Sequence, residues 1–277
     1  MRISEAPVVE TSTSPHELRR ETAVAIEAAR NALAFAAEHQ RDAALTVKGD
    51  RDVVTTADVA VEDAVRAMVA EALGHRVVGE ERGGDAGARG SPYWLVDPIC
   101  GTRNFASGIP LYCTNLALVE NGVVASAVVG DASTGSVCVA ERGRGAWVAE
   151  GDRFRRLTTS DDSATVVIED SRAAGPRREQ AAQLVGSAVR ADRWDLRALS
   201  TTLALAYVAA GRVAAYVLCW TSAVHAAAGS LVAAEAGATV SDLDGRPWTI
   251  ASDSIVAAAT EGLHRELLDL AAGAPSA

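Results

Sequence analysis

The sequence lacks the features that mark several classes of protein. Its four cysteines, at positions 100, 113, 138 and 219, form neither a paired CxxC metal pattern nor a dense disulfide framework. The longest stretch without a charged residue, Val213 to Ala234, is interrupted by Thr, Ser, His and Gly, which is typical of buried core and not of a membrane span. The opening residues lack the apolar run of a secretory signal. These absences predict a cytoplasmic protein with reduced thiols and no membrane partner.

Basic residues are also scarce, because 26 Lys and Arg stand against 36 Asp and Glu and give a formal net charge of -10. Binding to a nucleic-acid backbone depends on clustered Lys and Arg that release counterions, and this sequence does not supply them. Hydrophobic residues make up 49% of the 277 residues, enough for a sizeable core. We therefore expect a folded protein of one large or two smaller domains that does not bind nucleic acid.

The order of the predicted elements indicates a layered α/β protein. Apolar periodicity predicts helices over 16–39 and 57–73, and β-prone runs predict a block of short strands over 93–140. After a polar segment at 158–163, strands and helices alternate, which favours stacked layers over a barrel of equal units. The predicted segments are a flexible N-terminal lead (1–15), an N-terminal α+β subdomain (16–158) and a C-terminal α/β subdomain (159–277).

Three motifs carry the chemistry. Residues 94–105 read WLVDPICGTRNF, Gly79-Glu80-Glu81 precedes them, and DVVTTAD at 52–58 lies earlier still. Together they resemble the inositol monophosphatase superfamily, and further matches such as AEAGA at 234–238 and SDLDG at 241–245 extend the resemblance over nearly the whole chain. The resemblance implies an αβαβα sandwich. It also implies Mg²⁺ held by the Glu of a GEE motif, both Asp residues of DPIDGT and the Asp of WDxAAG.

Two residues depart from this pattern. Cys100 stands where the family has the second Asp of DPIDGT, and His225 stands where it has the Asp of WDxAAG. In the family, the two carboxylates at these positions bind the same ion. We therefore expect Cys100 and His225 to lie side by side. Thiolate and imidazole are poor ligands for Mg²⁺, so the departure predicts no metal and no other resident cofactor. The same pair suits covalent catalysis, with Cys100 as nucleophile and His225 as its base.

Other residues would support this pair. Asp131, at the end of a predicted strand, is the first candidate to orient the imidazole, and Asp97 is its rival. The backbone N–H groups of Gly101 and Thr102 could form an oxyanion hole, and a helix starting there would favour the Cys100 thiolate. Glu80, together with Asp97 and Thr102, preserves one half of the family's metal site.

With Cys, Asp and His in this chain order, the sequence is similar to the cysteine-dependent Dieckmann cyclases, which share the inositol monophosphatase fold. That resemblance implies release of a β-ketoacyl aminoacyl chain from the phosphopantetheine thioester of a carrier protein or assembly-line module. Closure of the Cys-linked acyl chain would give a tetramic acid ring, as in polyketide/nonribosomal peptide antibiotic biosynthesis. A homodimer is left open. The alternatives are a metal-dependent phosphomonoesterase with a reduced metal site and a catalytically inactive, phosphatase-fold binding subunit.

Overall fold

A computed structural model describes residues 18–41, 45–49, 52–88, 90–151, 153–169 and 175–273, so the predicted lead at 1–15 lies outside the described residues. These residues form a seven-stranded sheet in the order β3-β4-β5-β6-β7-β8-β9 and a five-stranded sheet in the order β11-β10-β12-β14-β13. The helices are α1 (Arg20–His39), α2 (Thr56–Leu73), α3 (Thr102–Ala106), α4 (Pro176–Ala191), α5 (Leu203–Ala209), α6 (Ala223–Glu235) and α7 (Glu261–Ala271). The strands are β1 (Leu45–Gly49), β2 (Asp52–Thr55), β3 (Arg76–Gly79), β4 (Tyr93–Cys100), β5 (Cys113–Glu120), β6 (Val123–Asp131), β7 (Val137–Glu141), β8 (Gly145–Glu150), β9 (Arg153–Arg156), β10 (Thr165–Glu169), β11 (Asp195–Arg197), β12 (Ala215–Leu218), β13 (Thr239–Ser241) and β14 (Ile255–Ala258).

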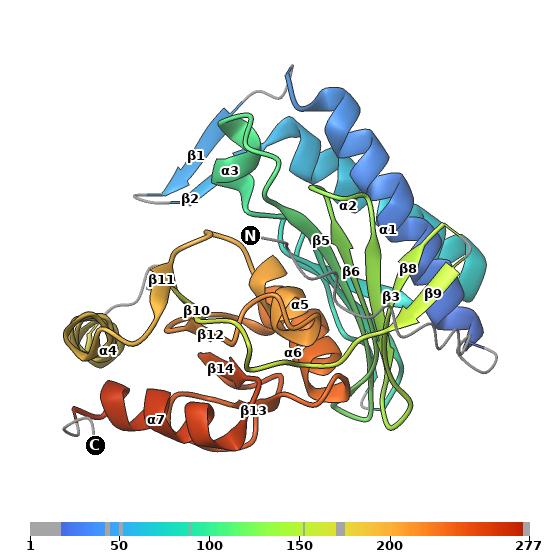
Figure 1. The fold of residues 1–277 in the computed structure, drawn as a ribbon. Coiled ribbons are helices and arrows are strands. Elements are labelled where there is room, and N and C mark those ends of the chain that lie inside the picture. Colours follow the sequence, from blue (N-terminus) through green and yellow to red (C-terminus); the bar gives the residue numbers. More distant parts are fainter. Residues whose placement is uncertain are drawn as a thin grey trace, which may run out of the picture.

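The elements stack in five layers, which confirms the predicted αβαβα sandwich (Figure 1). Helices α1 and α2 cover one face of the seven-stranded sheet, and α5 and α6 lie between the two sheets. Helices α4 and α7 cover the outer face of the five-stranded sheet. Because α6 contacts both sheets, its residues 226–233 are all buried. This burial between the two sheets explains why residues 213–234 include no Asp, Glu, Lys or Arg. The stretch was predicted to be buried core.

The chain passes from one sheet to the other between β9 and β10, over residues 157–164. The predicted boundary between residues 158 and 159 falls in this connection, and the independence of the two subdomains stays a prediction. No helix formed by the described residues has the length and apolar character needed to cross a bilayer. The cytoplasmic location stays a prediction.

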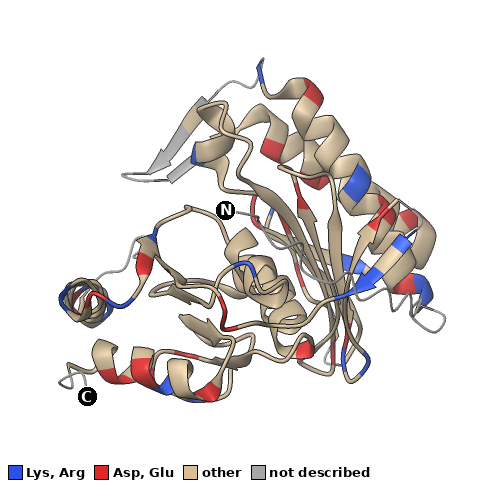
Figure 2. Ribbon diagram, in the orientation of Figure 1, with Lys and Arg blue, Asp and Glu red and all other residues tan. Residues whose placement is uncertain are grey.

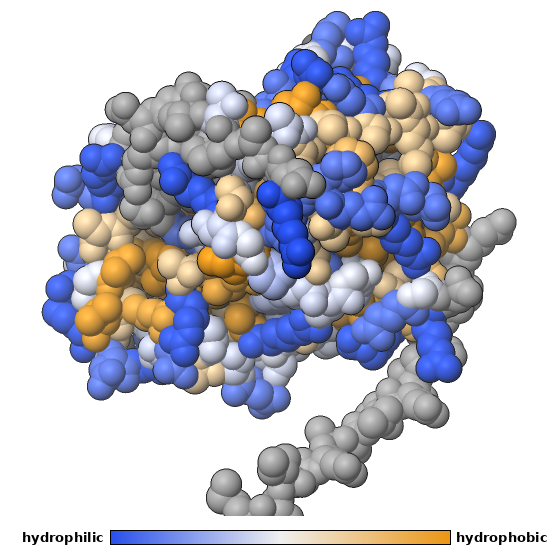
Figure 3. All heavy atoms as spheres, turned by 90° about the horizontal axis from the view of Figure 1, so that it is seen from above, coloured by the Kyte–Doolittle hydropathy of each residue, from blue (hydrophilic) through white to orange (hydrophobic). Residues whose placement is uncertain are grey.

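Charge and hydropathy are unevenly distributed over the described surface. Figure 2 shows Lys and Arg interspersed with Asp and Glu along the ribbon, with both signs on α7. Seen from above, hydrophobic residues gather on the side of the molecule where α4 lies (Figure 3). Val185 and Val189, one turn apart on that helix, are among its exposed apolar side chains. Exposed apolar residues are common on a folded surface.

Strand pairing around β4 sets the positions of the motif residues Glu80, Asp97 and Cys100. Strands β3 and β4 are parallel, with Gly79 opposite Val96, and the Glu80 N–H donates to the Val96 carbonyl at 3.1 Å. This register brings Glu80 beside Asp97, the next residue along β4. Strand β5 pairs with β4 in the antiparallel direction, and its register shifts between Asp97 and Cys100, where Pro98 has no N–H to donate.

Glycine is needed at position 79 because the carboxylate of Glu62 occupies the space that a Cβ atom would fill. A Cβ at this position would lie 2.2 Å from Glu62 Oε1. Glu62 cannot move away without loss, because it accepts hydrogen bonds from Arg66 and from the N–H groups of Glu81 and Arg82. Glu62 therefore fixes the start of the loop that carries Glu80.

We expect Gly79→Ala to lower the free energy of unfolding by about 1–3 kcal/mol, the cost of leaving a buried hydrogen-bonding group unsatisfied. Urea unfolding followed by circular dichroism measures this change. Gly262→Ala is the matched control, because a Cβ there meets only Thr260 Oγ1, at 4.0 Å. Equal stability of the two variants would show that Glu62 is not held in place as described.

Candidate functional site

The site joins the end of β4 to the first turn of α6. His225 Nδ1 lies 2.7 Å from Asp97 Oδ2, a hydrogen bond in which the ring N–H donates to the carboxylate. His225 Nε2 lies 3.9 Å from Glu80 Oε1. One potential ligand atom from each of Asp97, Cys100 and His225 lies within 4.8 Å of the other two. Cys100 and His225 thus lie side by side, as their positions in the motifs predicted.

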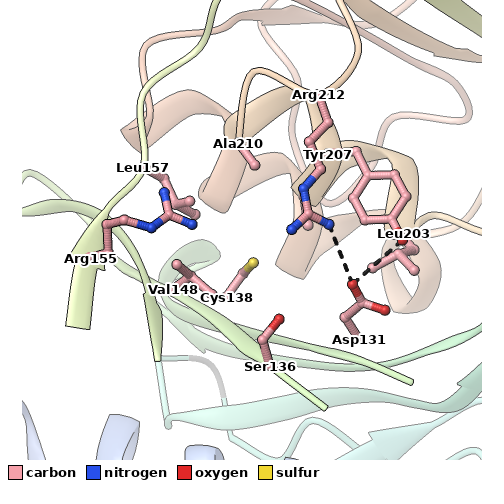
Figure 4. Close-up of a pocket in the computed structure, with 11 residues that line it drawn as sticks. Asp131, Ser136, Cys138, Val148, Arg155, Leu157, Leu203, Tyr207, Ala210 and Arg212 are labelled. Atoms are coloured by element: carbon pink, nitrogen blue, oxygen red, sulfur yellow. Dashed lines mark hydrogen bonds and ion pairs between the residues drawn. The ribbon is translucent and has the colours of Figure 1, made fainter. Parts of the chain in front are cut away.

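Asp131 does not orient His225, which corrects the first choice made from the sequence. Its Oδ1 accepts from the Ser133 N–H and hydroxyl, at 2.8 and 2.7 Å, and its Oδ2 lies 3.5 Å from the Tyr207 hydroxyl and 3.8 Å from Arg212 Nη1. Figure 4 shows Asp131 with Tyr207 and Arg212 in a separate pocket that Cys138 also lines. Asp97 occupies the orienting position instead. The catalytic roles assigned to these residues stay predictions.

The Cys100 thiol is buried and its surroundings disfavour ionisation. The Thr202 N–H donates to Cys100 Sγ at 3.4 Å, and the Thr202 hydroxyl lies 3.0 Å from the same sulfur. The Cys113 thiol, on the strand residue opposite Cys100, and burial raise the pKa of Cys100 well above its usual value, and His225 opposes this only in part. The expectation of a thiolate favoured by the following helix is therefore wrong. That helix, α3, has only five residues.

Gly101 and Thr102 shape the turn that follows Cys100. Gly101 has φ +106°, and a Cβ there would lie 3.1 Å from the Leu111 carbonyl oxygen, so only glycine fits without strain. Thr102 Oγ1 lies 3.2 Å from Asp58 Oδ1 and 3.1 Å from the Ile99 carbonyl oxygen, and its hydroxyl can donate to either. The oxyanion hole proposed for their N–H groups stays a prediction.

Asp58 and Thr202 belong to the site although the sequence analysis did not single them out as site residues. Asp58 is the N3 residue of a capping box with Thr55, which holds its carboxylate at the start of α2. Thr202 binds the Cys100 sulfur, and Asn115 Nδ2 donates to Thr202 Oγ1 at 3.0 Å. The capping-box spacing of Thr55 and Asp58 is a sequence signal that could have pointed to Asp58. The contact of Thr202 spans 102 positions of the chain and left no local signal.

The acidic groups of the site are held in unfavourable surroundings for a negative charge. Burial, together with the nearby charge of Asp97, raises the pKa of Glu80 from 4.5 to about 8. Burial, followed by the charge of Cys100, raises the pKa of Asp97 from 3.8 to about 7. Burial would lower the pKa of His225, but the hydrogen bond to Asp97, with Cys100 and Glu80, outweighs it and raises this pKa well above 6.5.

These shifts predict how the stability of the metal-free protein depends on pH. The raised pKa values mean that the folded state binds more protons than the unfolded state between about pH 4.5 and 8. Stability is therefore greatest at the acidic end of this window and falls as pH rises. Unfolding midpoints in urea with a chelator present measure the trend, and Glu80→Gln should flatten it. A midpoint that rises with pH in the wild-type protein would contradict the assignment.

One atom of the site is left without a hydrogen-bond donor. Asp97 has no exposed surface, and its Oδ1 accepts no hydrogen bond within the described part of the chain. The Glu80 carboxyl is close enough to pair with Asp97, but only when one of the two acids carries a proton. An unpaired buried carboxylate oxygen costs several kcal/mol unless a proton or a cation occupies it. The arrangement therefore fits a bound cation.

A protein-family comparison matches residues 17–275 to the inositol monophosphatase family, and the chain belongs to that family. An inositol-1-monophosphatase of Mesorhizobium japonicum is 35% identical over 227 residues, which cover 81% of this chain and 84% of the relative. A protein of Pasteurella multocida named Nus factor SuhB is 32% identical over 253 residues, covering 89% and 93% of the two chains. The structure of the extragenic suppressor protein suhB from Bartonella henselae superposes with a TM-score of 0.81 at 26% identity, covering 90% and 97%.

These comparisons correct the functional prediction. The relatives are named as inositol monophosphatases or SuhB, so the prediction of a cysteine-dependent Dieckmann cyclase that releases tetramic acids from a carrier-bound phosphopantetheine is wrong. A phosphatase-family function replaces it. The superfamily itself was identified correctly from the motifs. The carrier protein and the homodimer, as partners, stay predictions.

The prediction of no cofactor is also wrong, because the family depends on metal ions. Two carboxylates, those of Glu80 and Asp97, fit a divalent cation in this chain, since Asp97 Oδ1 has no hydrogen-bond donor among the described residues. Cys100 and His225 do not fit the Mg²⁺ that the family uses, because Mg²⁺ prefers oxygen ligands in octahedral geometry. The position of the family's metal site is therefore lined by a different set of side chains in this chain.

Proposed function

We propose that this protein is a metal-dependent phosphomonoesterase that hydrolyses the phosphate ester of a small polyhydroxylated molecule. The single observation that carries the proposal is the fully buried, unpaired Oδ1 of Asp97 beside Glu80, in a chain of the inositol monophosphatase family. A related protein named inositol-1-monophosphatase supports the substrate class.

Each residue of the site has a part in this function. Asp97 and Glu80 would hold the cation, which supplies charge stabilisation for the phosphoryl group and an activated water. Asp58, whose charge acts on Glu80, accepts a hydrogen bond from the Thr102 hydroxyl. Thr102 Oγ1 is then able to accept a hydrogen bond from a water. His225 is held in one orientation by Asp97 and has a second nitrogen that faces Glu80.

The test uses protein that has been freed of metal ions with a chelator. Phosphate release from inositol 1-phosphate and from p-nitrophenyl phosphate is measured after addition of Mg²⁺, Mn²⁺, Co²⁺ or Zn²⁺. We expect release with at least one of these ions and none with the chelator alone. Glu261→Gln, on the exposed surface of α7, is the control variant and should match the wild-type rate. Absence of release with every ion and both substrates would favour the alternative of a catalytically inactive binding subunit.

A further inference from the structure

We propose that Glu169 is a positioning residue of the candidate site. Its carboxylate holds the loop 199–202, and this loop fixes the segment 100–104, which follows β4. The inference deepens the proposed phosphomonoesterase and rests on it for the effect on turnover, but the placement of the segment can be measured without turnover. Glu169 ends β10 in the five-stranded sheet, whereas β4 belongs to the seven-stranded sheet. The loop therefore joins the two sheets at the site.

The Glu169 carboxylate binds two consecutive backbone N–H groups of the loop. Its Oε1 accepts from the Leu199 N–H at 2.7 Å and from the Ser200 N–H at 2.6 Å. Glu169 is buried, and hydrogen bonds to a charged acceptor are stronger than those between neutral groups. The Cys219 N–H also donates to the Glu169 carbonyl oxygen at 2.9 Å, which fixes the backbone from which the carboxylate extends.

Ser200 adopts a backbone conformation that needs such support. Its φ is +56°, in the left-handed region, which is unfavourable for a residue with a side chain. Residues in this region persist where the surrounding contacts determine the backbone, and they are concentrated at functional sites. Glu169 supplies one of these contacts. The segment 100–104 supplies another, because Asn104 Nδ2 donates to the Leu199 carbonyl oxygen at 2.7 Å.

The next two residues of the loop hold Cys100. The Thr201 hydroxyl donates to the Cys100 carbonyl oxygen at 2.8 Å, and the Thr202 N–H donates to Cys100 Sγ at 3.4 Å. Thr202 is itself fixed by Asn115, whose Nδ2 donates to its hydroxyl oxygen at 3.0 Å. Both threonines are buried. They therefore restrain the backbone and the sulfur of Cys100 together.

Gly101 and Thr102 follow directly and depend on the same loop. A Cβ at Gly101 would lie 3.3 Å from the Ser200 carbonyl oxygen, so the loop packs closely against this backbone. The Thr102 hydroxyl lies 3.2 Å from Asp58 Oδ1, at the start of α2. A shift of the loop would move Thr102 relative to Asp58, and a displacement of about 1 Å at a reacting centre can lower a rate about 100-fold. Glu169 thus acts on turnover through the loop, without touching the substrate.

The first experiment measures the restraint on Cys100 without turnover. The full-length protein is treated with iodoacetamide at one pH in the presence of a chelator, and peptide mass spectrometry follows alkylation of Cys100. Glu169→Met keeps the length of the side chain but removes its acceptor oxygens. We expect alkylation at least about tenfold faster in this variant, because two hydrogen bonds to a charged group are lost. Glu169→Gln retains one acceptor oxygen and should stay closer to the wild-type rate.

Glu235→Met is the matched control. The Glu235 carboxylate also accepts from two backbone N–H groups, those of Gly143 and Gly145, at 2.7 and 2.8 Å. These glycines lie in the turn between β7 and β8, at the end of the sheet opposite to Cys100. We expect Glu235→Met to lower the unfolding midpoint in urea but to leave the alkylation of Cys100 at the wild-type rate. Circular dichroism confirms folding of each variant.

A rescue variant tests the loop itself. Glycine adopts a positive φ without strain, so Ser200→Gly should stabilise the loop and bring the alkylation rate of Glu169→Met back toward the wild-type rate. Asn121→Gly is the control for this rescue, because Asn121 has φ +53° in the turn between β5 and β6. It removes the same strain elsewhere and should restore nothing. The proposal is overturned if Glu169→Met alkylates at the wild-type rate, if Glu235→Met is accelerated equally, or if Asn121→Gly restores as much as Ser200→Gly.

Phosphate release is the second readout and distinguishes this inference from the proposed function. In Glu169→Met we expect kcat to fall at least about tenfold while KM changes little, because the buried carboxylate acts only through the loop. Faster alkylation of Cys100 in Glu169→Met, with no phosphate release by the wild-type protein under any ion, would support the positioning role and contradict the phosphomonoesterase. Phosphate release by the wild-type protein, with kcat and alkylation unchanged in Glu169→Met, would support the phosphomonoesterase and contradict the positioning role.

Discussion

Asp97→Asn is expected to lower both the affinity for the activating cation and the rate of phosphate release at least about 100-fold, the upper end of the loss caused by removing a group that only supports a ligand. Asp97 has two tasks, because Oδ2 holds His225 and Oδ1 is free for the ion. The amide of Asn carries no charge and can offer only one oxygen. It can satisfy one task but not both.

Isothermal titration with Zn²⁺ and phosphate release measure the two losses, and Asp131→Asn is the matched control. Asp131 is also buried and lies on β6 of the same sheet, but its contacts go to Ser133, Tyr207 and Arg212. We expect that variant to bind the ion as the wild-type protein does. If Asp131→Asn loses binding and Asp97→Asn keeps it, the site is wrongly drawn.

The double variant Cys100→Asp/His225→Asp is expected to bind Mg²⁺ more tightly than the wild-type protein does. It replaces the sulfur and nitrogen donors with two carboxylates at the end of β4 and the start of α6. Mg²⁺ affinity should rise at least about tenfold, because hard oxygen ligands favour Mg²⁺. Added carboxylates repel each other without an ion, so Mg²⁺ should also raise the unfolding temperature of this variant more than that of the wild-type protein.

The matched control for this switch is Cys100→Ser/His225→Asn, which removes the soft donors without adding carboxylates. A gain of Mg²⁺ binding in the carboxylate variant and not in this control would show that the added carboxylates cause it. An unchanged Mg²⁺ affinity in the carboxylate variant would show that positions 100 and 225 do not contact the ion.

The order of elements and the location of the site were predictable from the sequence, because both depend on local patterns. Apolar periodicity predicted α1 and α2, and the β-prone runs marked β4 to β7, although the structure extends β4 to Cys100. The motifs around Glu80, Asp97 and Cys100 follow each other closely along the chain. Their resemblance to one family therefore indicated the fold and placed His225 opposite Cys100.

The few residues of these motifs did not determine the function. The sequence comparison over most of the chain supports a phosphatase-family function, whereas two substituted ligands had suggested covalent catalysis. The raised pKa of Cys100 illustrates the reason. A thiol beside a histidine suggests a nucleophile in a sequence, but its ionisation depends on burial and on Cys113 across the sheet, which no spacing along the chain expresses.

The layered fold, the acidic and largely apolar composition, and the meeting of Cys100 with His225 could all be predicted from the amino-acid sequence. That Asp97, not Asp131, holds the imidazole is visible only in the packed structure, because Asp97 lies within β4 and faces His225, whereas Asp131 ends β6, two strands away, beside Tyr207 and Arg212. The packed structure also leaves Oδ1 of Asp97 without a donor among the described residues. Hydrogen bonds between residues more than a hundred positions apart depend on how strands and helices pack, and packing is set by the whole chain at once.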